Sequence, residues 1–194
     1  MNNKRLLKIT LFSFFINTAY GIANVAFGVF EESGWLFATG VYYLFLSVMR
    51  IAALTSRDKQ SSVFVRKFTA VMLMMLSVVL VFIVILSSIK DRGTKYHEII
   101  MITMAVYAFT KITVAIINIV KSGKSRFVVT KTLRSISLAD AAVSIFALQR
   151  SMLVSFGEMK ALDIRTFNIA TGSAVCVFVC LVGLNLLFSK STYY

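Results

Sequence analysis

Long apolar runs separated by short polar segments are the main pattern along the chain. The runs lie near residues 9–30, 34–54, 68–89, 98–120, 135–156 and 167–188. A helix needs about 20 mostly apolar residues to cross a hydrocarbon layer of about 30 Å, and every run reaches that length. The pattern therefore predicts an all-α fold, a polytopic integral membrane bundle of six transmembrane helices.

The charges of the connecting segments predict how these spans are oriented. Lys and Arg gather before the first span, in the 57–67 and 121–134 segments and in the C-terminal tail. Most of the eight acidic residues, among them Glu31 and Glu158, lie in or beside the other segments. Because cytoplasmic loops carry an excess of Lys and Arg, we expect a protein of the cell membrane with both termini in the cytoplasm.

A cleaved secretory signal is an alternative interpretation of the first run. Lys4 and Arg5 precede apolar residues, and small residues follow at Ala19 and Gly21, as in such a signal. The apolar run continues to Phe30, whereas the apolar part of a signal is about 7–15 residues long. Its length favours an uncleaved span, and cleavage would leave five spans with the same inside loops.

The composition agrees with a membrane location and leaves little chain for anything else. Of the 194 residues, 58% are apolar and the mean hydropathy is +0.83, whereas soluble domains are roughly 45–50% apolar. Six spans leave only short loops, so we expect residues 1–194 to form a single transmembrane domain without a soluble domain. This argues against an enzyme with a soluble active site.

The net charge of +13 would suggest nucleic-acid binding in a soluble protein. Here the basic residues lie in loops between spans, as membrane insertion requires, and no basic motif interleaved with aromatic residues is present. We therefore expect no nucleic-acid partner. The 57–67 and 121–134 loops should attract anionic lipid, since each basic residue near the surface contributes about 1 kcal/mol. A second copy of the chain or another membrane protein is a further candidate partner.

Three spans carry polar residues at spacings of three, four and seven, which place them on one helical face. The polar residues on these faces are Asn17, Tyr20 and Asn24 in the first span, Tyr107, Lys111 and Asn118 in the fourth, and Ser137, Asp140, Ser144 and Ser151 in the fifth. The three faces predict a common polar interior. For Ser and Asn, ordinary hydrogen bonding between helices is an alternative interpretation.

Lys111 and Asp140 are the charged residues on these polar faces. A charge near the bilayer centre costs about 2.5–3.5 kcal/mol on insertion scales, so each should be paired or solvated in a cavity. The fourth and fifth spans are joined by a short loop and should be antiparallel neighbours, within reach of a Lys side chain. We therefore predict a Lys111–Asp140 pair. It is either a substrate or ion site or a salt bridge that fixes helix packing. Extension of the Lys111 side chain to the membrane surface is a third interpretation.

Short similarities between the two halves of the chain raise the hypothesis of an inverted repeat. Arg50 ends the sequence FLSVMR, and Arg150 ends FALQR. Spans one to three and four to six would run in opposite senses, which is the design of many secondary transporters. Similarity between unrelated hydrophobic helices is the alternative.

The third and sixth spans show different patterns. The third span is apolar on all sides, which favours a position in lipid at the outside of the bundle. In the sixth span Gly172, Cys176 and Cys180 form a ridge of small residues that permits close helix packing. The chain contains no proline, so any break in a helix would depend on glycines such as Gly21.

No complete catalytic or metal-binding motif is present in the sequence. His97 and Glu98 begin like a zinc-protease helix, but Met101 stands where the second His is required. A Ser144–Lys111 dyad could be drawn on the helical faces, but such a pair is expected by chance in a Ser-rich bundle. We therefore expect no cofactor, no metal and no enzymatic activity.

The sequence thus leaves three hypotheses for function. The first is a small solute or ion transporter, or a channel subunit, with a polar interior lined by spans one, four and five. The alternative is a structural or regulatory membrane protein in which the Lys–Asp pair only holds helices together. An intramembrane enzyme is the third.

Overall fold

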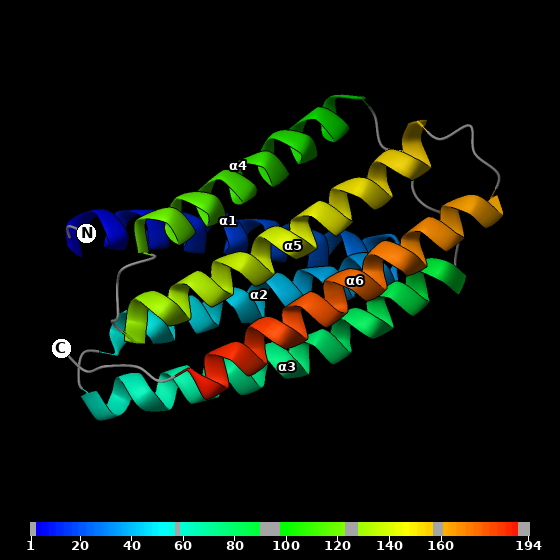
Figure 1. Ribbon diagram of the computed structural model, residues 1–194. Coiled ribbons are helices and arrows are strands. Elements are labelled where there is room, and N and C mark those ends of the chain that lie inside the picture. The colour runs from blue at the N-terminus through cyan, green and yellow to red at the C-terminus, as the bar shows by residue number, and fades with distance from the viewer. Residues whose placement is uncertain (1–2, 57–58, 90–97, 123–127, 157–160, 190–194) are drawn as a thin grey trace.

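The computed structural model describes residues 3–56, 59–89, 98–122, 128–156 and 161–189. These residues form an all-helical bundle (Figure 1), and no strand occurs among them. The helices, in chain order, are α1 (Asn3–Phe30), α2 (Gly34–Thr55), α3 (Lys59–Ile89), α4 (Glu98–Ser122), α5 (Val128–Phe156) and α6 (Ala161–Phe188). Several begin before the apolar run that predicted them, because the helical hydrogen bonds continue into the polar residues that flank each run.

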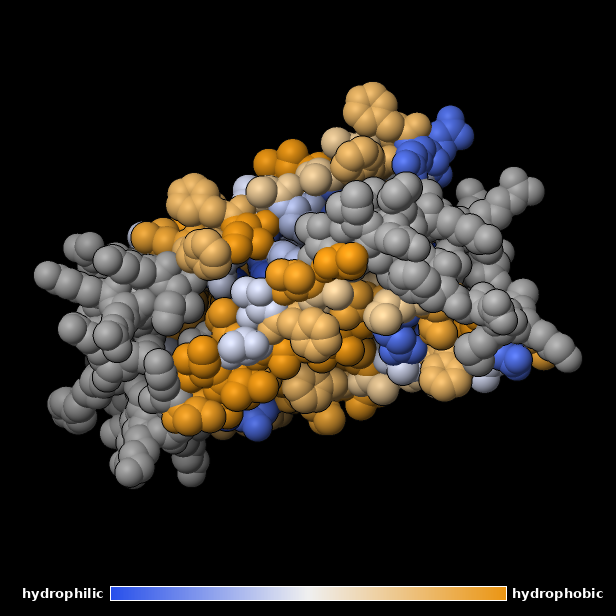
Figure 2. Space-filling model, turned by 90° about the horizontal axis from the view of Figure 1, so that it is seen from above, coloured by the Kyte–Doolittle hydropathy of each residue, from blue (hydrophilic) through white to orange (hydrophobic). Residues whose placement is uncertain are grey.

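Five of these helices, α1, α2, α3, α5 and α6, are long and apolar enough to cross a membrane. In α4 the corresponding apolar stretch covers the shorter segment Ala105–Ile117 within the described residues. Large apolar side chains cover the outside: Phe15 is 66% exposed and Phe82 is 62% exposed. Figure 2 shows this apolar surface across the middle of the molecule. A water-soluble protein rarely exposes so much contiguous apolar surface, and the expected membrane protein is confirmed at this level.

Consecutive helices pack side by side within each half of the chain. In the first half α1 packs on α2 and α2 on α3, and in the second half α4 packs on α5 and α5 on α6. The halves contact each other through the pairs α2–α5, α3–α6 and α3–α5. Figure 1 shows α2 and α5 in the middle, with α1 and α4 on one side and α3 and α6 on the other.

Glycines bring α1 and α2 into close contact. A Cβ atom at Gly40 would lie 2.6 Å from the backbone nitrogen of Val25, and one at Gly28 would lie 2.5 Å from the backbone nitrogen of Phe37. Neither distance is possible between real atoms, so only glycine allows the two backbones to approach this far. Both helices continue through these glycines without a break, which therefore serve packing.

One face of α3 lies in the core. Leu73, Leu80 and Ile83 are almost fully buried, whereas Met75 and Phe82 on other faces are more than 60% exposed. The apolar face packs against α6, where the predicted small-residue ridge begins with Gly172 in contact with Val84. α3 lies at the outside of the bundle (Figure 1), and its other faces are exposed, but one face packs against protein, which the uniformly apolar pattern did not reveal.

Candidate functional site

Asp140 of α5 lies at the centre of a buried group of charged and polar side chains. Its Oδ2 atom accepts hydrogen bonds from Arg50 Nη2 at 2.6 Å, Lys111 Nζ at 2.7 Å and Asn17 Nδ2 at 3.0 Å. The donors come from α2, α4 and α1, so a single carboxylate oxygen joins four helices. We refer to Asn17, Arg50, Lys111 and Asp140 as the Asp140 cluster.

The local sequence explains how each helix presents its residue. Asn17 and Lys111 lie near the midpoints of α1 and α4, within mostly apolar stretches. In α2, Tyr43, Ser47 and Arg50 follow one another at spacings of four and three, which align them on one face. The Ser47 hydroxyl donates to the Tyr43 carbonyl, which satisfies it within its own helix. Tyr43 and Arg50 of this face both reach α5, Tyr43 at the Ser144 hydroxyl and Arg50 at Asp140.

The cluster carries an excess of positive charge. The Arg50, Lys111 and Asp140 side chains are only 4%, 7% and 1% exposed, and two cations share one carboxylate. With all three ionised, the net charge is one positive unit. Taking charges out of water costs several kcal/mol per ion, and the ion contacts offset this cost only where opposite charges balance. One positive charge in the cluster therefore has no matching negative charge among its members.

Two atoms of the cluster still have capacity to bind. Asp140 Oδ1 and Arg50 Nε are buried and have no hydrogen-bond partner among the described residues. A buried polar atom without a partner costs about 1–3 kcal/mol. The cluster thus contains one acceptor and one donor that could form hydrogen bonds with a further polar group.

Three tyrosines form one wall of the cluster. The rings of Tyr20 and Tyr107 stack at 4.6 Å between centroids, and Tyr43 meets Tyr20 edge to face at 5.1 Å. The Tyr107 hydroxyl donates to Asn17 Oδ1 at 3.3 Å, and Lys111 Nζ lies 5.0 Å from the centre of the Tyr107 ring. The ring face attracts the ammonium group, so the tyrosine wall orients both Asn17 and Lys111 towards Asp140.

The structure brings most of the predicted polar residues to this cluster or next to it. Lys111 and Asp140 form an ion pair, Asn17 joins them, and Tyr20 and Tyr107 belong to the tyrosine wall. Ser144 lies one turn along α5 from Asp140, where its hydroxyl contacts the Tyr43 hydroxyl at 3.1 Å and donates to the Asp140 carbonyl.

Other predicted lining residues lie away from the carboxylate. Asn24 is buried, but its amide donates to the Tyr20 carbonyl within α1. Ser151 donates to the Ala147 carbonyl within α5. Ser137 is buried in the same helix, one turn before Asp140, and the side chain of Asn118 lies outside the described residues. Asn24, Ser137 and Ser151 are thus buried, but Asn24 and Ser151 lie two turns or more along their helices from Asn17 and Asp140.

Arg50 and Tyr43 were missed by the sequence reasoning. Arg50 stands near the end of an apolar run, where a basic residue is typical of the cytoplasmic end of a span. The spacing of Tyr43, Ser47 and Arg50 is the signal that would have found them, because it repeats the pattern of the three polar faces that were recognised. The second span therefore belongs to the polar interior together with the first, fourth and fifth.

A second arginine crosses between the central helices in the opposite direction. The guanidinium carbon of Arg150 in α5 lies 4.3 Å from the centre of the Trp35 ring in α2. Arg50 of α2 reaches α5, and Arg150 of α5 reaches α2. Each half of the chain thus places one arginine side chain against the central helix of the other half.

Known proteins do not extend this description. No protein-family model matches the chain, and no curated protein matches it significantly. Within the described residues, no group of three or more His, Cys, Asp or Glu side chains could hold a metal ion. The site therefore has to be interpreted from its own chemistry, that of a positively charged, tyrosine-lined cluster inside a membrane bundle.

Proposed function

We propose that this protein is a small membrane transporter or channel subunit for an anionic solute, with the Asp140 cluster as its binding site. The observation that carries the proposal is the burial of two cations and one carboxylate between four helices of an apolar bundle. Ionisable residues inside a membrane bundle usually mark substrate or ion pathways because their burial is costly. The unmatched positive charge selects the sign of the solute.

An anion would complete the electrostatics of the site. A monovalent anion beside Arg50 and Lys111 would bring the net charge of the cluster to zero, and Arg50 Nε would supply a donor for it. A cation would add to the repulsion already present between the Arg50 and Lys111 side chains. The preference for an anion therefore follows from charge balance.

The proposed topology has six spans with both termini in the cytoplasm. We include α4 as one of the six spans, because Asp140 compensates the charge of Lys111 inside it. α1 begins and α6 ends at the same end of the bundle (Figure 1), as an even number of antiparallel spans requires. The basic loops at that end favour the cytoplasm.

The two halves of the bundle are proposed to be inverted repeats that move against each other. The contacts between helices correspond: α1–α2 matches α4–α5, and α2–α3 matches α5–α6. Arg50 of α2 likewise corresponds to Arg150 of α5, since each contacts the central helix of the other half. In such transporters the substrate lies at the interface between repeats, and rocking of one repeat exposes it to either side. The Asp140 cluster lies at the corresponding place.

Ligand stabilisation followed by flux measurements tests the proposal. The purified protein would be heated with chloride, nitrate, phosphate, acetate and glutamate, with sodium and potassium as counter-ions. An anion at a hundredfold excess over its Kd should stabilise the protein by about 2.7 kcal/mol. Lys111→Gln should abolish this stabilisation and also the uptake of the same anion into proteoliposomes. Lys67→Gln, an exposed cation of α3, serves as the control and should change neither.

The structural alternative retains one specific observation in its favour. Both cations touch Asp140 directly, at 2.6 and 2.7 Å, as in a cluster that only holds helices together. In that case no anion would stabilise the protein, and flux would equal that of empty liposomes. An enzymatic role has less support, because the Ser144 hydroxyl is bonded to Tyr43 and to the Asp140 carbonyl, and Lys111 contacts Asp140.

A further inference from the structure

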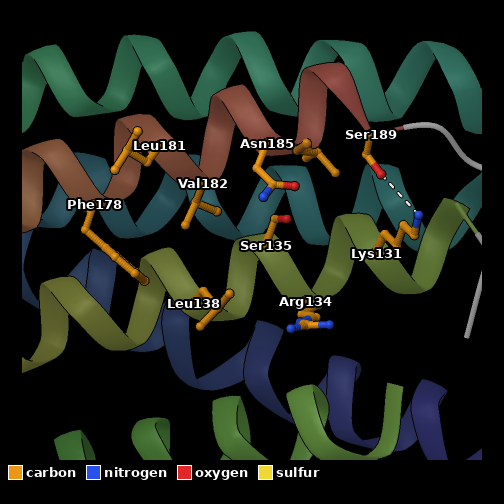
Figure 3. A pocket seen from close by; sticks show the side chains of 10 residues that line it. Lys131, Arg134, Ser135, Leu138, Phe178, Leu181, Val182, Asn185 and Ser189 are labelled. Atoms are coloured by element: carbon orange, nitrogen blue, oxygen red, sulfur yellow. Dashed lines mark hydrogen bonds between the residues drawn. The ribbon is translucent and has the colours of Figure 1, made fainter. Parts of the chain in front are cut away.

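A groove of about 430 Å³ runs along the outside of the bundle between α5 and α6. Figure 3 shows side chains from both helices lining it. Its lining includes Lys131, Arg134, Leu138, Phe178, Leu181 and Ser189. Phe178 and Leu181 are 41% and 57% exposed, so the groove opens onto the surface that faces lipid. It is separate from the Asp140 cluster.

The two ends of the groove differ in chemistry. Lys131 and Arg134 lie at one end, near the start of α5 and the end of α6 (Figure 3). Lys131 Nζ donates to the Ser189 hydroxyl at 3.1 Å, and Arg66 of α3 donates to the Ser189 carbonyl at 2.6 Å. Three basic residues thus gather at this end, and no acidic residue is among the described residues that line the groove.

The other end of the groove is apolar. Leu138 of α5 and Phe178, Leu181 and Val182 of α6 form its walls (Figure 3). From Ser189 to Phe178 the helix rises about 16 Å at 1.5 Å per residue. This length is about half of a hydrocarbon layer of about 30 Å, which is the depth of one leaflet. The groove therefore has a cationic end at the bilayer surface and an apolar end one leaflet deep.

We propose that this groove binds an anionic phospholipid, with the phosphate at Lys131 and Arg134 and one acyl chain along Leu138 and Leu181. Basic pockets between transmembrane helices are known to take anionic lipid headgroups, and the apolar walls add a match to the chain. The expected attraction of anionic lipid to the basic loops thereby becomes a defined site on the transmembrane surface. This inference does not depend on the transport proposal.

Quenching of tryptophan fluorescence by brominated lipid tests the groove. The Leu181→Trp variant would be reconstituted in mixtures of phosphatidylcholine with dibrominated phosphatidylglycerol, and separately with dibrominated phosphatidylcholine. The unmodified protein supplies the background from Trp35. Phe82→Trp, at an exposed position on α3 outside the groove, reports the lipid preference of the general surface.

The expected result is a strong preference for phosphatidylglycerol at Leu181→Trp and a weak one at Phe82→Trp. Each basic residue near the headgroup contributes about 1 kcal/mol, which is a factor of about five in affinity. Together, Lys131 and Arg134 should raise the affinity of the groove for phosphatidylglycerol over phosphatidylcholine about thirtyfold. Adding Lys131→Gln and Arg134→Gln should remove the preference at the groove and leave that at Phe82→Trp unchanged. Lys67→Gln with Arg165→Gln removes the same charge from two exposed positions elsewhere and should have no effect at the groove.

Three results would overturn the inference. Equal preferences at the two tryptophans would show that the groove is ordinary lipid-facing surface. A preference that survives loss of Lys131 and Arg134, or that is lost equally in the Lys67 and Arg165 control, would show that the groove charges do not bind the headgroup. If the variants fail to fold, thermal stability of the unmodified protein decides: phosphatidylglycerol should stabilise it more than phosphatidylcholine of the same chains, and soluble glycerol phosphate should not. Equal stabilisation by both lipids would again refute the site.

Discussion

Replacing Asp140 with Asn should destabilise the protein more than any other single change in the Asp140 cluster. The Arg50 and Lys111 nitrogens both touch one oxygen of Asp140, so they are no more than about 5.3 Å apart. At that separation and an effective dielectric constant of about 20, two positive charges repel by about 3 kcal/mol. Asp140→Asn removes both attractions and retains this repulsion. We expect a loss of about 3–5 kcal/mol, typical of a broken buried ion pair.

Lys111→Met should behave differently, because it leaves the neutral Arg50–Asp140 pair in place. The lost Lys111–Asp140 attraction is offset by the loss of the repulsion from Arg50 and of the cost of burying an ammonium group. Replacing a buried charge with an apolar residue of similar volume is often neutral, so we expect a change within about 1 kcal/mol.

The double variant Lys111→Met/Asp140→Asn distinguishes a three-charge cluster from an isolated pair. If the two residues were an isolated pair, removing both would restore stability. Because Arg50 would remain buried without a carboxylate, we expect the double variant to stay about 3–5 kcal/mol below the parent. Adding Arg50→Met should recover most of this loss.

The assay is reversible unfolding in dodecyl maltoside on titration with sodium dodecyl sulfate, followed by circular dichroism. Lys67→Gln controls for a charge change at an exposed position. Parental stability of Asp140→Asn, or of the Lys111→Met/Asp140→Asn double variant, would refute the three-charge interpretation.

Three further predictions concern packing, the tyrosine wall and topology. Gly40→Ala should cost about 1–3 kcal/mol by overpacking the α1–α2 contact, measured in the same unfolding assay, and an unchanged stability would contradict the observed proximity. Tyr107→Phe should lose the hydrogen bond to Asn17 but keep the ring stacking, a change of about 0.6 kcal/mol, and a loss of several kcal/mol would point to a larger role for the hydroxyl. In a variant without Cys176 and Cys180, a cysteine at Glu31 should react with an impermeant maleimide on intact cells, and one at Ser61 only after permeabilisation. The reverse pattern would invert the proposed topology.

α1 and α3 differ in whether the sequence pattern identifies the buried face of the helix. In α1 the spacing of Asn17, Tyr20 and Asn24 marks a polar face because most neighbouring positions are apolar. Asn17 and Tyr20 lie at the cluster in the structure, whereas Asn24 bonds within α1. Between Phe68 and Leu86 of α3 almost every position is apolar, so core and lipid faces are nearly identical in composition. The face that packs against α6 could not be identified from the sequence, since lipid and protein interior are equally apolar partners.

The sequence by itself determined the helical membrane architecture and the faces on which Lys111 and Asp140 lie, because length, hydropathy and helical periodicity are local properties. Only the tertiary structure decided that Arg50 shares the carboxylate of Asp140, that glycines draw α1 against α2, and that α5 and α6 leave a groove with a basic end. These features depend on how helices distant in sequence are placed against one another. The partner of a buried charge is decided by which helices pack together. The contact of Arg50 with Asp140 therefore could not be predicted from the sequence around Arg50.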